Sequence, residues 1–265
     1  MPLPLKIVYF VEPDAAALAE RAARHFVEGI EAAVARRGRA RIAISGGSTP
    51  KAVFAALADK ARPWRARIAW ERLEIYWVDE RCVGPEDAAS NYRMTREELL
   101  DRVPMGPEQI HRMEGELEPE VAAARYESEL RNSFRLEGAE SPRFDLVQLG
   151  MGADGHTASL FPGSEAIYEF GRLVVANQTT AAQAWRLTLT AQTINQGADV
   201  FFVVSGGEKA EVLGEVLTGA RDVERLPSQL IRPANGILTL FLDRAAARLL
   251  PEADGNGRGE LVRNE

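Results

Sequence analysis

FDLVQLG (144–150) is the clearest candidate for a buried strand in the chain. Its apolar run is nearly continuous, which is typical of a parallel strand covered on both faces. Further strand-like segments are KIVYFVE (6–12), RIAIS (41–45), LEIYWVD (73–79), RLVVAN (172–177), WRLTLT (185–190), ADVFFVVSG (198–206) and ILTLFLD (237–243). Together these segments predict a sheet with a buried centre.

Helical patterns lie between these segments. The longest begins at Asp14, ends at Arg37 and is closed by Gly38. Others cover residues 50–62, 90–102, 119–136, 208–217 and 244–250. Alternation of strands and helices at this spacing predicts β-α-β units with parallel strands in a layered α/β fold.

A length of 265 residues fits one large α/β domain. No internal repeat and no linker rich in proline or glycine divides the chain, so we expect a single domain over residues 1–250. The segment PEADGNGRGELVRNE (251–265) has turn-forming and charged residues but few apolar ones. We expect this tail to be mobile.

Composition and charge exclude several classes of protein. Hydrophobic residues make up 46% of the chain and charged residues 27%, as in a globular protein with a core. Net charge is −7, which disfavours nucleic-acid binding. One cysteine and three histidines leave little for a disulfide framework or a His/Cys zinc site, and we expect no metal. Neither a signal peptide nor a membrane-spanning stretch is recognisable, so we expect a cytoplasmic protein that binds no membrane.

The first motif that could carry chemistry is SGGSTPK (45–51), which follows the segment RIAIS and opens a helix. Gly46 and Gly47 would let backbone N–H groups converge on an anion, and the helix N-terminus adds positive potential. The proline suits the first helical position, with Ser48 or Thr49 as the N-cap. The P-loop and dinucleotide glycine patterns are absent. We expect a phosphate site of another kind, with a plain tight turn as the alternative.

Charged residues also end the strand-like segment at 73–79. Asp79, Glu80 and Arg81 stand at its carboxyl end, and Ser-Asn-Tyr (90–92) opens the next helix. Arg81 could clamp a phosphate or a carboxylate. The alternative is an ion pair that caps the strand.

The glycine-rich stretch GMGADGHTASLFPG (150–163) directly follows the buried strand at 144–150. Its glycines would let the backbone turn closely around a ligand and aim Asp154 and His156 into one crevice. An imidazole can take a proton from water near neutral pH, and a nearby carboxylate can fix its tautomer. We therefore expect His156 to be a functional residue.

Two more basic residues lie at strand ends. Arg186 begins RLTLT, and Lys209 follows Gly206 and Gly207, which repeat the earlier glycine turn. Either residue alone would be ordinary solvated surface. Together with Arg81 they could form a phosphate pocket in an otherwise acidic protein.

Taken together, these segments resemble the 6-phosphogluconolactonase family, and more distantly the glucosamine-6-phosphate deaminases of the same glucosamine/galactosamine-6-phosphate isomerase superfamily. The matching pieces, in family order, are AISGGSTPKAVF (43–54), WVDERCVGPEDAASNY (77–92), FDLVQLGMGADGHTASLFPG (144–163), WRLTLTAQTIN (185–195) and FFVVSGGEKAEVL (201–213). GADGHTASLFPG is highly specific, whereas SGGSTP is shared by both groups.

The resemblance implies a three-layer α/β fold of modified Rossmann type, with a mostly parallel sheet flanked by helices. It also implies hydrolysis of 6-phospho-D-glucono-1,5-lactone to 6-phospho-D-gluconate in the oxidative pentose phosphate pathway, without a cofactor. The partner would be this small sugar-phosphate lactone, and the protein would be a monomer or a homodimer.

The same resemblance implies roles for individual residues. His156 would be the general base toward water, and Asp154 would orient His156 or the water. Residues implied in binding the substrate and its phosphate are Gly46, Gly47, Ser48, Thr49, Asp79, Arg81, Arg186 and Lys209. The oxyanion donors stay open between N–H groups of the glycine loop and Arg81.

Phe161 separates the two groups of relatives. The deaminases look like D-G-H-x-A-x-N-E-P, with a carboxylate before the proline, where this chain has Phe161 before Pro162. Isomerisation with loss of an amine needs several proton transfers, which Phe cannot carry, whereas lactone hydrolysis needs one activated water. The alternatives to a lactonase are a sugar-phosphate isomerase or deaminase, and a sensor that binds a sugar phosphate without turnover.

Overall fold

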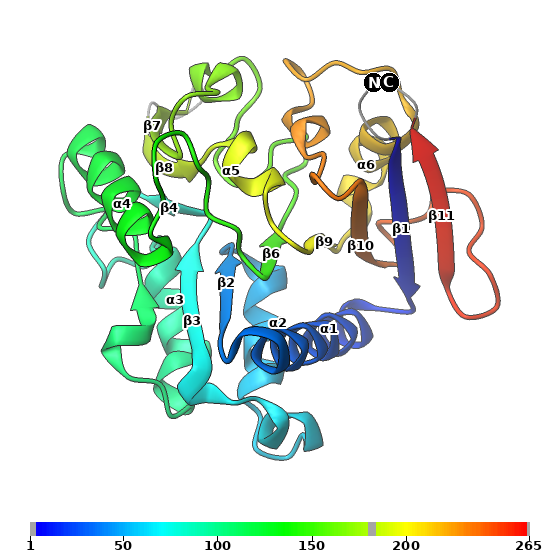
Figure 1. The fold of residues 1–265 in the computed structure, drawn as a ribbon. Helices are drawn as coiled ribbons and strands as arrows, with labels where there is room; N and C mark the ends of the chain where they lie inside the picture. The colour runs from blue at the N-terminus through cyan, green and yellow to red at the C-terminus, as the bar shows by residue number, and fades with distance from the viewer. Residues whose placement is uncertain (1–3, 180–183, 264–265) are drawn as a thin grey trace.

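All the apolar segments except 172–177 and 185–190 form one large sheet in the computed structural model, which describes residues 4–179 and 184–263. In spatial order its strands are β11 (Arg258–Arg263), β1 (Leu5–Glu12), β10 (Ile237–Asp243), β9 (Val200–Val204), β6 (Leu146–Leu149), β2 (Ala40–Ile44), β3 (Leu73–Trp77) and β5 (Ile110–His111) (Figure 1). Every neighbouring pair runs parallel except β11 and β1. The predicted α/β fold with a mostly parallel sheet is confirmed.

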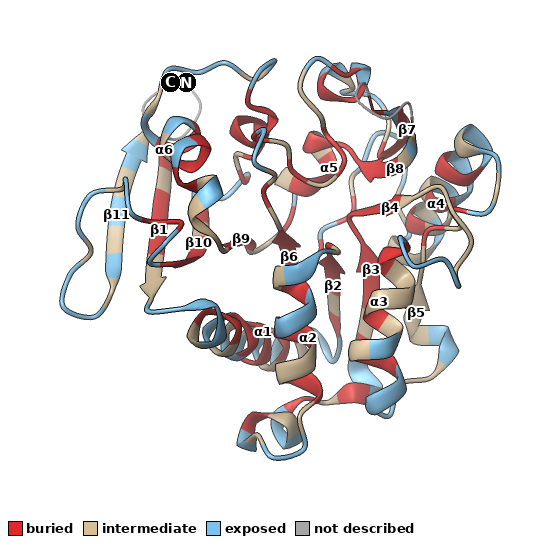
Figure 2. Ribbon diagram, turned by 180° about the vertical axis from the view of Figure 1, so that it is seen from behind, coloured by how far each residue is buried: buried red, intermediate tan, exposed pale blue. Residues whose placement is uncertain are grey.

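Helices lie on both faces of this sheet. They are α1 (Ala15–Arg37), α2 (Ser48–Ala58), α3 (Asn91–Glu98), α4 (Pro119–Phe134), α5 (Ala191–Asn195) and α6 (Ala210–Thr218). Successive side chains of a strand point to opposite faces. The ring of Tyr76 contacts Phe134 of α4, and the ring of Trp77, the next residue, contacts Tyr92 of α3. Because α3 and α4 therefore cover opposite faces, the central strands are buried between them (Figure 2).

Helix α1 shows how local sequence sets the bounds of an element. The Asp14 carboxylate accepts the N–H groups of Ala16 and Ala17, and Gly38 ends the helix with φ 72°. The buried face consists of Leu18, Ala19, Ala22, Ala23, Phe26, Val27, Ile30 and Ala33. Burying a large apolar side chain stabilises by about 1.5–3 kcal/mol, so packing holds this helix on the sheet. In the described ranges, no helix is both long enough and apolar enough to cross a membrane.

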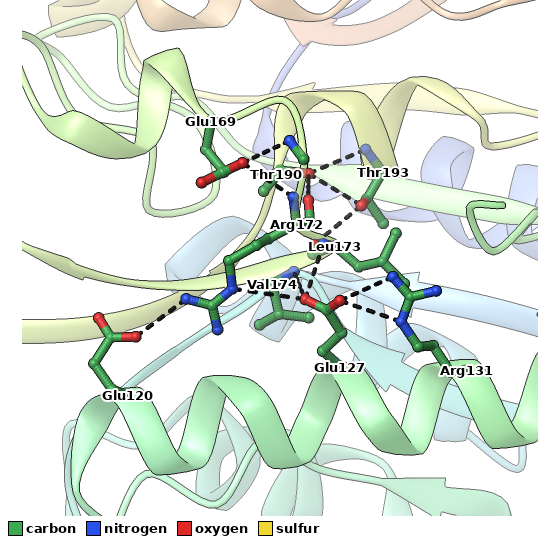
Figure 3. A network of polar contacts seen from close by, with 10 residues as sticks. Glu120, Glu127, Arg131, Glu169, Arg172, Leu173, Val174, Thr190 and Thr193 are labelled. Atoms are coloured by element: carbon green, nitrogen blue, oxygen red, sulfur yellow. Dashed lines mark hydrogen bonds and ion pairs between the residues drawn. The ribbon is translucent and has the colours of Figure 1, made fainter. Parts of the chain in front are cut away.

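A second, small antiparallel sheet begins with the strand that follows β3 along the chain. It consists of β4 (Asp79–Arg81), β8 (Trp185–Leu189) and β7 (Val174–Gln178). Glu127 of α4 ties this sheet to the helix, because it accepts the N–H groups of Leu173 and Val174 at 3.1 and 3.4 Å (Figure 3). Arg131 and Arg172 lie 3.0 and 3.8 Å from the same carboxylate. The small sheet is thus fixed at its β7 edge.

The predicted helix over residues 244–250 is wrong: this segment forms hydrogen-bonded turns. The Asp243 carboxylate takes the N–H of Ala246, and the carbonyl of Asp243 takes the N–H of Ala247. Pro251 follows and disfavours helical backbone in the residue before it. The chain therefore leaves these turns at Leu250 without forming a helix.

The segment 251–265, expected to be a mobile tail, contains a strand in its described part, and residues 264 and 265 lie outside the described residues. Arg258–Arg263 form β11, paired antiparallel with β1 at the edge of the sheet. Gly259 lies directly over Tyr9, since a Cβ there would be 2.0 Å from the ring carbon Cζ. Few apolar residues are needed, because β11 pairs with β1 through backbone hydrogen bonds and its side chains are exposed or half-buried.

Candidate active site

A cavity of about 200 Å³ opens at the carboxyl ends of the central strands. Its wall consists of Ser45, Gly46, Gly47, Ser48, Thr49, Pro50, Asp79, Arg81, Asn91, Gly150, Met151, Gly152, His156, Ala158, Val203 and Lys209. Most of these residues follow β2, β3, β6 or β9 directly. Parallel strands bring their carboxyl ends to one edge, so segments far apart in the sequence meet there.

The turn after β2 presents the N-terminus of α2 to this cavity. Gly47, with φ 112°, is the N-cap, and no side chain caps the helix. The prediction of Ser48 or Thr49 as the cap is therefore wrong, because the glycine backbone lets the helix begin before the proline. The N–H groups of the first turn are left for a ligand, and the helix adds positive potential there.

Asn91 packs against the same turn. A Cβ on Gly46 would lie 1.8 Å from Asn91 Oδ1, so a side chain at position 46 would displace Asn91. The Asn91 side chain donates to the carbonyl oxygen of Asp79 at 3.0 Å. The buried Glu80 carboxylate accepts the N–H groups of Asn91 and Tyr92 at 2.7 and 2.8 Å. Glu80 thereby holds the start of α3 against the cavity.

His156 and Asp154 form a hydrogen-bonded pair. The Nδ1 atom of His156 lies 2.5 Å from Oδ1 of Asp154, which also accepts the His156 N–H at 3.2 Å. The hydrogen bond from His156 holds the pKa of Asp154 below its usual range. An ionised carboxylate keeps the proton on Nδ1, which leaves Nε2 as the nitrogen that can accept one.

The glycine loop after β6 makes this pair sterically feasible. A Cβ on Gly152 would lie 2.2 Å from His156 Nδ1 and 2.6 Å from Asp154 Oδ1. Gly155 has φ 81°, and Ala158 takes φ 50°, a conformation uncommon for residues other than glycine. The close turn expected from the glycines is therefore what places the imidazole in the cavity wall.

Asp79 is a buried carboxylate in the same wall. Burial raises its pKa, while the hydrogen bond from Ser159 and the charges of Arg81 and His156 act in the opposite direction. The Ser159 hydroxyl donates to Asp79 Oδ2 at 2.8 Å. Because Ser159 follows His156 in the glycine loop, this bond ties the loop to β4.

Two of the cations in the cavity wall form no direct ion pair with a carboxylate among the described residues. Within the described residues, neither Arg81 nor Lys209 forms an ion pair; Arg81 donates instead to the carbonyl oxygen of Ala89. Arg186 is not part of the wall, but its Cα is paired with that of Arg81 across β4 and β8. Burial, and next the charge of Arg81, lower the pKa of Arg186. This clustering favours binding of an anion.

The structure brings most of the predicted site residues together. Those in the wall are Gly46, Gly47, Ser48, Thr49, Asp79, Arg81, His156 and Lys209. Asp154 reaches the site through His156, and Arg186 flanks it. The sequence prediction omitted Asn91, which the sequence marks only as a polar residue at the start of a helix. It also omitted Val203, which looks like any apolar strand residue.

Comparisons with known proteins agree with this geometry. A sequence profile described as Glucosamine-6-phosphate isomerases/6-phosphogluconolactonase matches residues 13–240. A 6-phosphogluconolactonase of Synechocystis is 38% identical over 235 residues, which cover 88% of this chain and 95% of the relative. One of Haemophilus influenzae is 38% identical over 79% of this chain and 87% of the relative.

Solved structures show the same relationship. The 6-phosphogluconolactonase from Trypanosoma cruzi has a TM-score of 0.79 and 32% identity, covering 94% of this chain and 98% of that chain. A monomeric glucosamine-6-phosphate deaminase, at 20% identity and a TM-score of 0.74, shares the fold. The profile and these relatives cover most of the sequence, and the chain therefore belongs to the family of glucosamine-6-phosphate isomerases and 6-phosphogluconolactonases.

Proposed function

We propose that this protein is a 6-phosphogluconolactonase, which hydrolyses 6-phospho-D-glucono-1,5-lactone to 6-phospho-D-gluconate in the oxidative pentose phosphate pathway. The observation that carries the proposal is that His156 and Lys209 line one cavity. Hydrolysis of this substrate needs a base at the lactone carbonyl and a cation at the phosphate. One cavity supplies both.

His156 acts as the general base in this mechanism. Its Nε2 takes a proton from water while the water oxygen attacks C1 of the lactone. The bond between C1 and the ring oxygen then breaks, and the ring oxygen takes the proton from His156 to become the hydroxyl on C5. Asp154 stabilises the imidazolium formed between these steps. Such a base contributes typically about 10²–10⁴-fold to the rate.

The negative charges of the substrate need separate partners. N–H groups of the glycine loop or the Arg81 guanidinium stabilise the oxyanion on the lactone carbonyl. The phosphate binds to the N–H groups of Gly47, Ser48 and Thr49 at the start of α2 and to the Lys209 ammonium, with Arg186 adding charge from the neighbouring strand. In a protein with a net charge of −7, local groups must hold a phosphate against the overall field.

Phe161 favours hydrolysis over isomerisation or deamination. Its ring centroid lies 4.5 Å from that of His156, at the position where the deaminase pattern has a carboxylate. A phenyl ring can pack on the imidazole but cannot relay a proton. Asp154 is thus the acidic neighbour of His156, and position 161 lacks the second carboxylate that a reaction with several proton transfers needs.

The test is the decay of 6-phosphogluconolactone above its spontaneous rate, measured beside unphosphorylated gluconolactone. We expect much faster turnover of the phosphorylated lactone, because only that substrate engages the cations. Ammonia release from glucosamine 6-phosphate is the parallel assay, and release without lactone turnover would establish a deaminase instead. Measurable affinity for the lactone with only spontaneous decay would establish a sensor.

A further inference from the structure

A buried carboxylate outside the cavity wall holds the segment that presents Lys209. Asp243 is the last residue of β10 and is only 6% exposed. It lies beside the end of β9, because Leu242 and Val204 are paired in the parallel ladder. No ion pair of Asp243 occurs in residues 4–179 and 184–263, so hydrogen bonds alone balance its charge. Burying a carboxylate is unfavourable unless such bonds satisfy it.

The hydrogen bonds of Asp243 lead to the turn after β9. Its Oδ2 accepts the hydroxyl of Ser205 and, at 3.0 Å, the N–H of Gly206, while Oδ1 accepts the N–H of Ala246 at 2.7 Å. Gly206 has φ 106°, and its carbonyl oxygen accepts the N–H of Lys209 at 3.2 Å. A continuous set of hydrogen bonds therefore connects the Asp243 carboxylate to the backbone of Lys209.

The other Ser-Gly-Gly turn of the cavity is held in a similar way. The Ser45 N–H donates to Oε1 of Gln148 at 3.2 Å, and Nε2 of Gln148 donates to the Ser45 hydroxyl at 2.9 Å. Gln148 lies on β6 beside β2, just as Asp243 lies on β10 beside β9. In both turns, a buried side chain of the neighbouring parallel strand fixes the first serine. This similarity between the two turns indicates that Asp243 and Gln148 both hold turns that form the cavity.

We propose that Asp243 is a positioning residue for phosphate binding, which sets the place of the Lys209 ammonium through Ser205 and Gly206. The inference rests on the proposed role of Lys209 in holding the substrate phosphate. Asp243 does not line the cavity, and the chemistry occurs at His156. Loss of the Asp243 carboxylate therefore weakens phosphate binding and leaves the chemical step unchanged.

Steady-state kinetics of Asp243→Ala, Lys209→Ala and the double variant, on both phosphorylated and unphosphorylated lactone, test this proposal. We expect Lys209→Ala to raise KM for the phosphorylated lactone by about 10–100-fold, the loss of one charge-assisted hydrogen bond. Asp243→Ala raises the same KM by about 3–10-fold, with kcat and the kinetics on unphosphorylated lactone unchanged. The double variant has the KM of Lys209→Ala, because without the lysine Asp243 has no ammonium to position.

The outcomes distinguish a failure of the positioning role of Asp243 from a failure of the proposed phosphate site. An equal effect of Asp243→Ala on both lactones, or additive effects in the double variant, overturns the positioning role. An unchanged KM in Lys209→Ala contradicts the proposed phosphate site itself. If Asp243→Ala does not fold, Ser205→Ala removes one hydrogen bond to the same carboxylate and must raise KM for the phosphorylated lactone selectively; otherwise the proposal fails.

Asp14→Ala is the matched control for lost stability. It removes the two hydrogen bonds that cap α1, and Asp14 is not part of the cavity wall. We expect a lower melting temperature with unchanged KM for both lactones. A selective rise of KM in this control would mean that destabilisation alone produces the effect, and the positioning role would be abandoned.

Discussion

Two carboxylates near His156 experience opposite environments. Asp154 is exposed and accepts a hydrogen bond from the imidazole, which lowers its pKa. Asp79 is buried, which raises its pKa. Environments that separate two similar groups in this way are typical of active sites. The exposed carboxylate is thus the one suited to orient His156, whereas the buried one is kept at an energetic cost.

The energetic cost of burying the Asp79 carboxylate leads to a prediction for Asp79→Asn. Because burial raises the pKa of Asp79, the folded state binds more protons than the unfolded state between the two pKa values, and stability falls as pH rises through this window. Asparagine does not titrate. We expect the melting temperature of Asp79→Asn to match wild type at about pH 3 and to exceed it by a few degrees at about pH 7. Thermal unfolding at several pH values checks this, and a difference that is independent of pH would contradict it.

At the scale of elements, the glycine loop after β6 carries a steric prediction. Alanine at position 152 places a Cβ 2.2 Å from His156 Nδ1, so the ring must move. We expect kcat of Gly152→Ala to fall by at least about tenfold, part of what a general base contributes. The control is Gly255→Ala, whose Cβ meets no atom within 4 Å. Equal activity of the two variants would show that the loop adapts.

The contact of α4 with the small sheet predicts a difference between two glutamates of that helix (Figure 3). Glu127→Gln loses the charge that faces Arg131 and Arg172, and we expect it to lower the free energy of unfolding by about 1–3 kcal/mol. Glu120→Gln breaks only an exposed pair with Arg172, worth less than about 1 kcal/mol. Urea unfolding measures both. Equal losses would mean that the charge of Glu127 beside Arg131 and Arg172 contributes little.

Where neighbouring residues set the first and last residue of a helix, these bounds were predictable from the sequence. The bounds of α1 follow from Asp14 and Gly38, which act on their own neighbours. The segment at 244–250 has helical spacing, and Asp243 accepts the N–H of Ala246 as a helix N-cap would, but Pro251 disfavours helical backbone in the residue before it. β11 depends on pairing with β1 across most of the chain length, and no local pattern encodes such a partner.

At the scale of the whole molecule, β11 lies at the opposite side of the sheet from β3 and β5, and the cavity wall contains no residue from it. Truncation after Leu250 removes β11 and the hydrogen bond from Tyr9 to Pro251. We expect the free energy of unfolding to drop by a few kcal/mol, a large part of the usual total. The kcat/KM measured below the melting temperature should be unchanged. Loss of activity in a folded truncated protein would contradict this separation.

Much of the candidate site was predictable because its motifs directly follow strands. Parallel strands bring the segments around Gly46, His156 and Lys209 to one edge whatever the details of packing. Asn91 and the flanking position of Arg186 depend on how β4 leaves the large sheet and pairs with β8. That geometry comes from tertiary contacts, which a single sequence does not display.

Turnover of 6-phosphogluconolactone by His156→Ala, corrected for spontaneous decay, tests the role of the imidazole as the base. We expect a kcat lower by about 10²–10⁴-fold, with KM nearly unchanged because the phosphate contacts remain. A variant that keeps the wild-type kcat would contradict the assignment of the imidazole as the base.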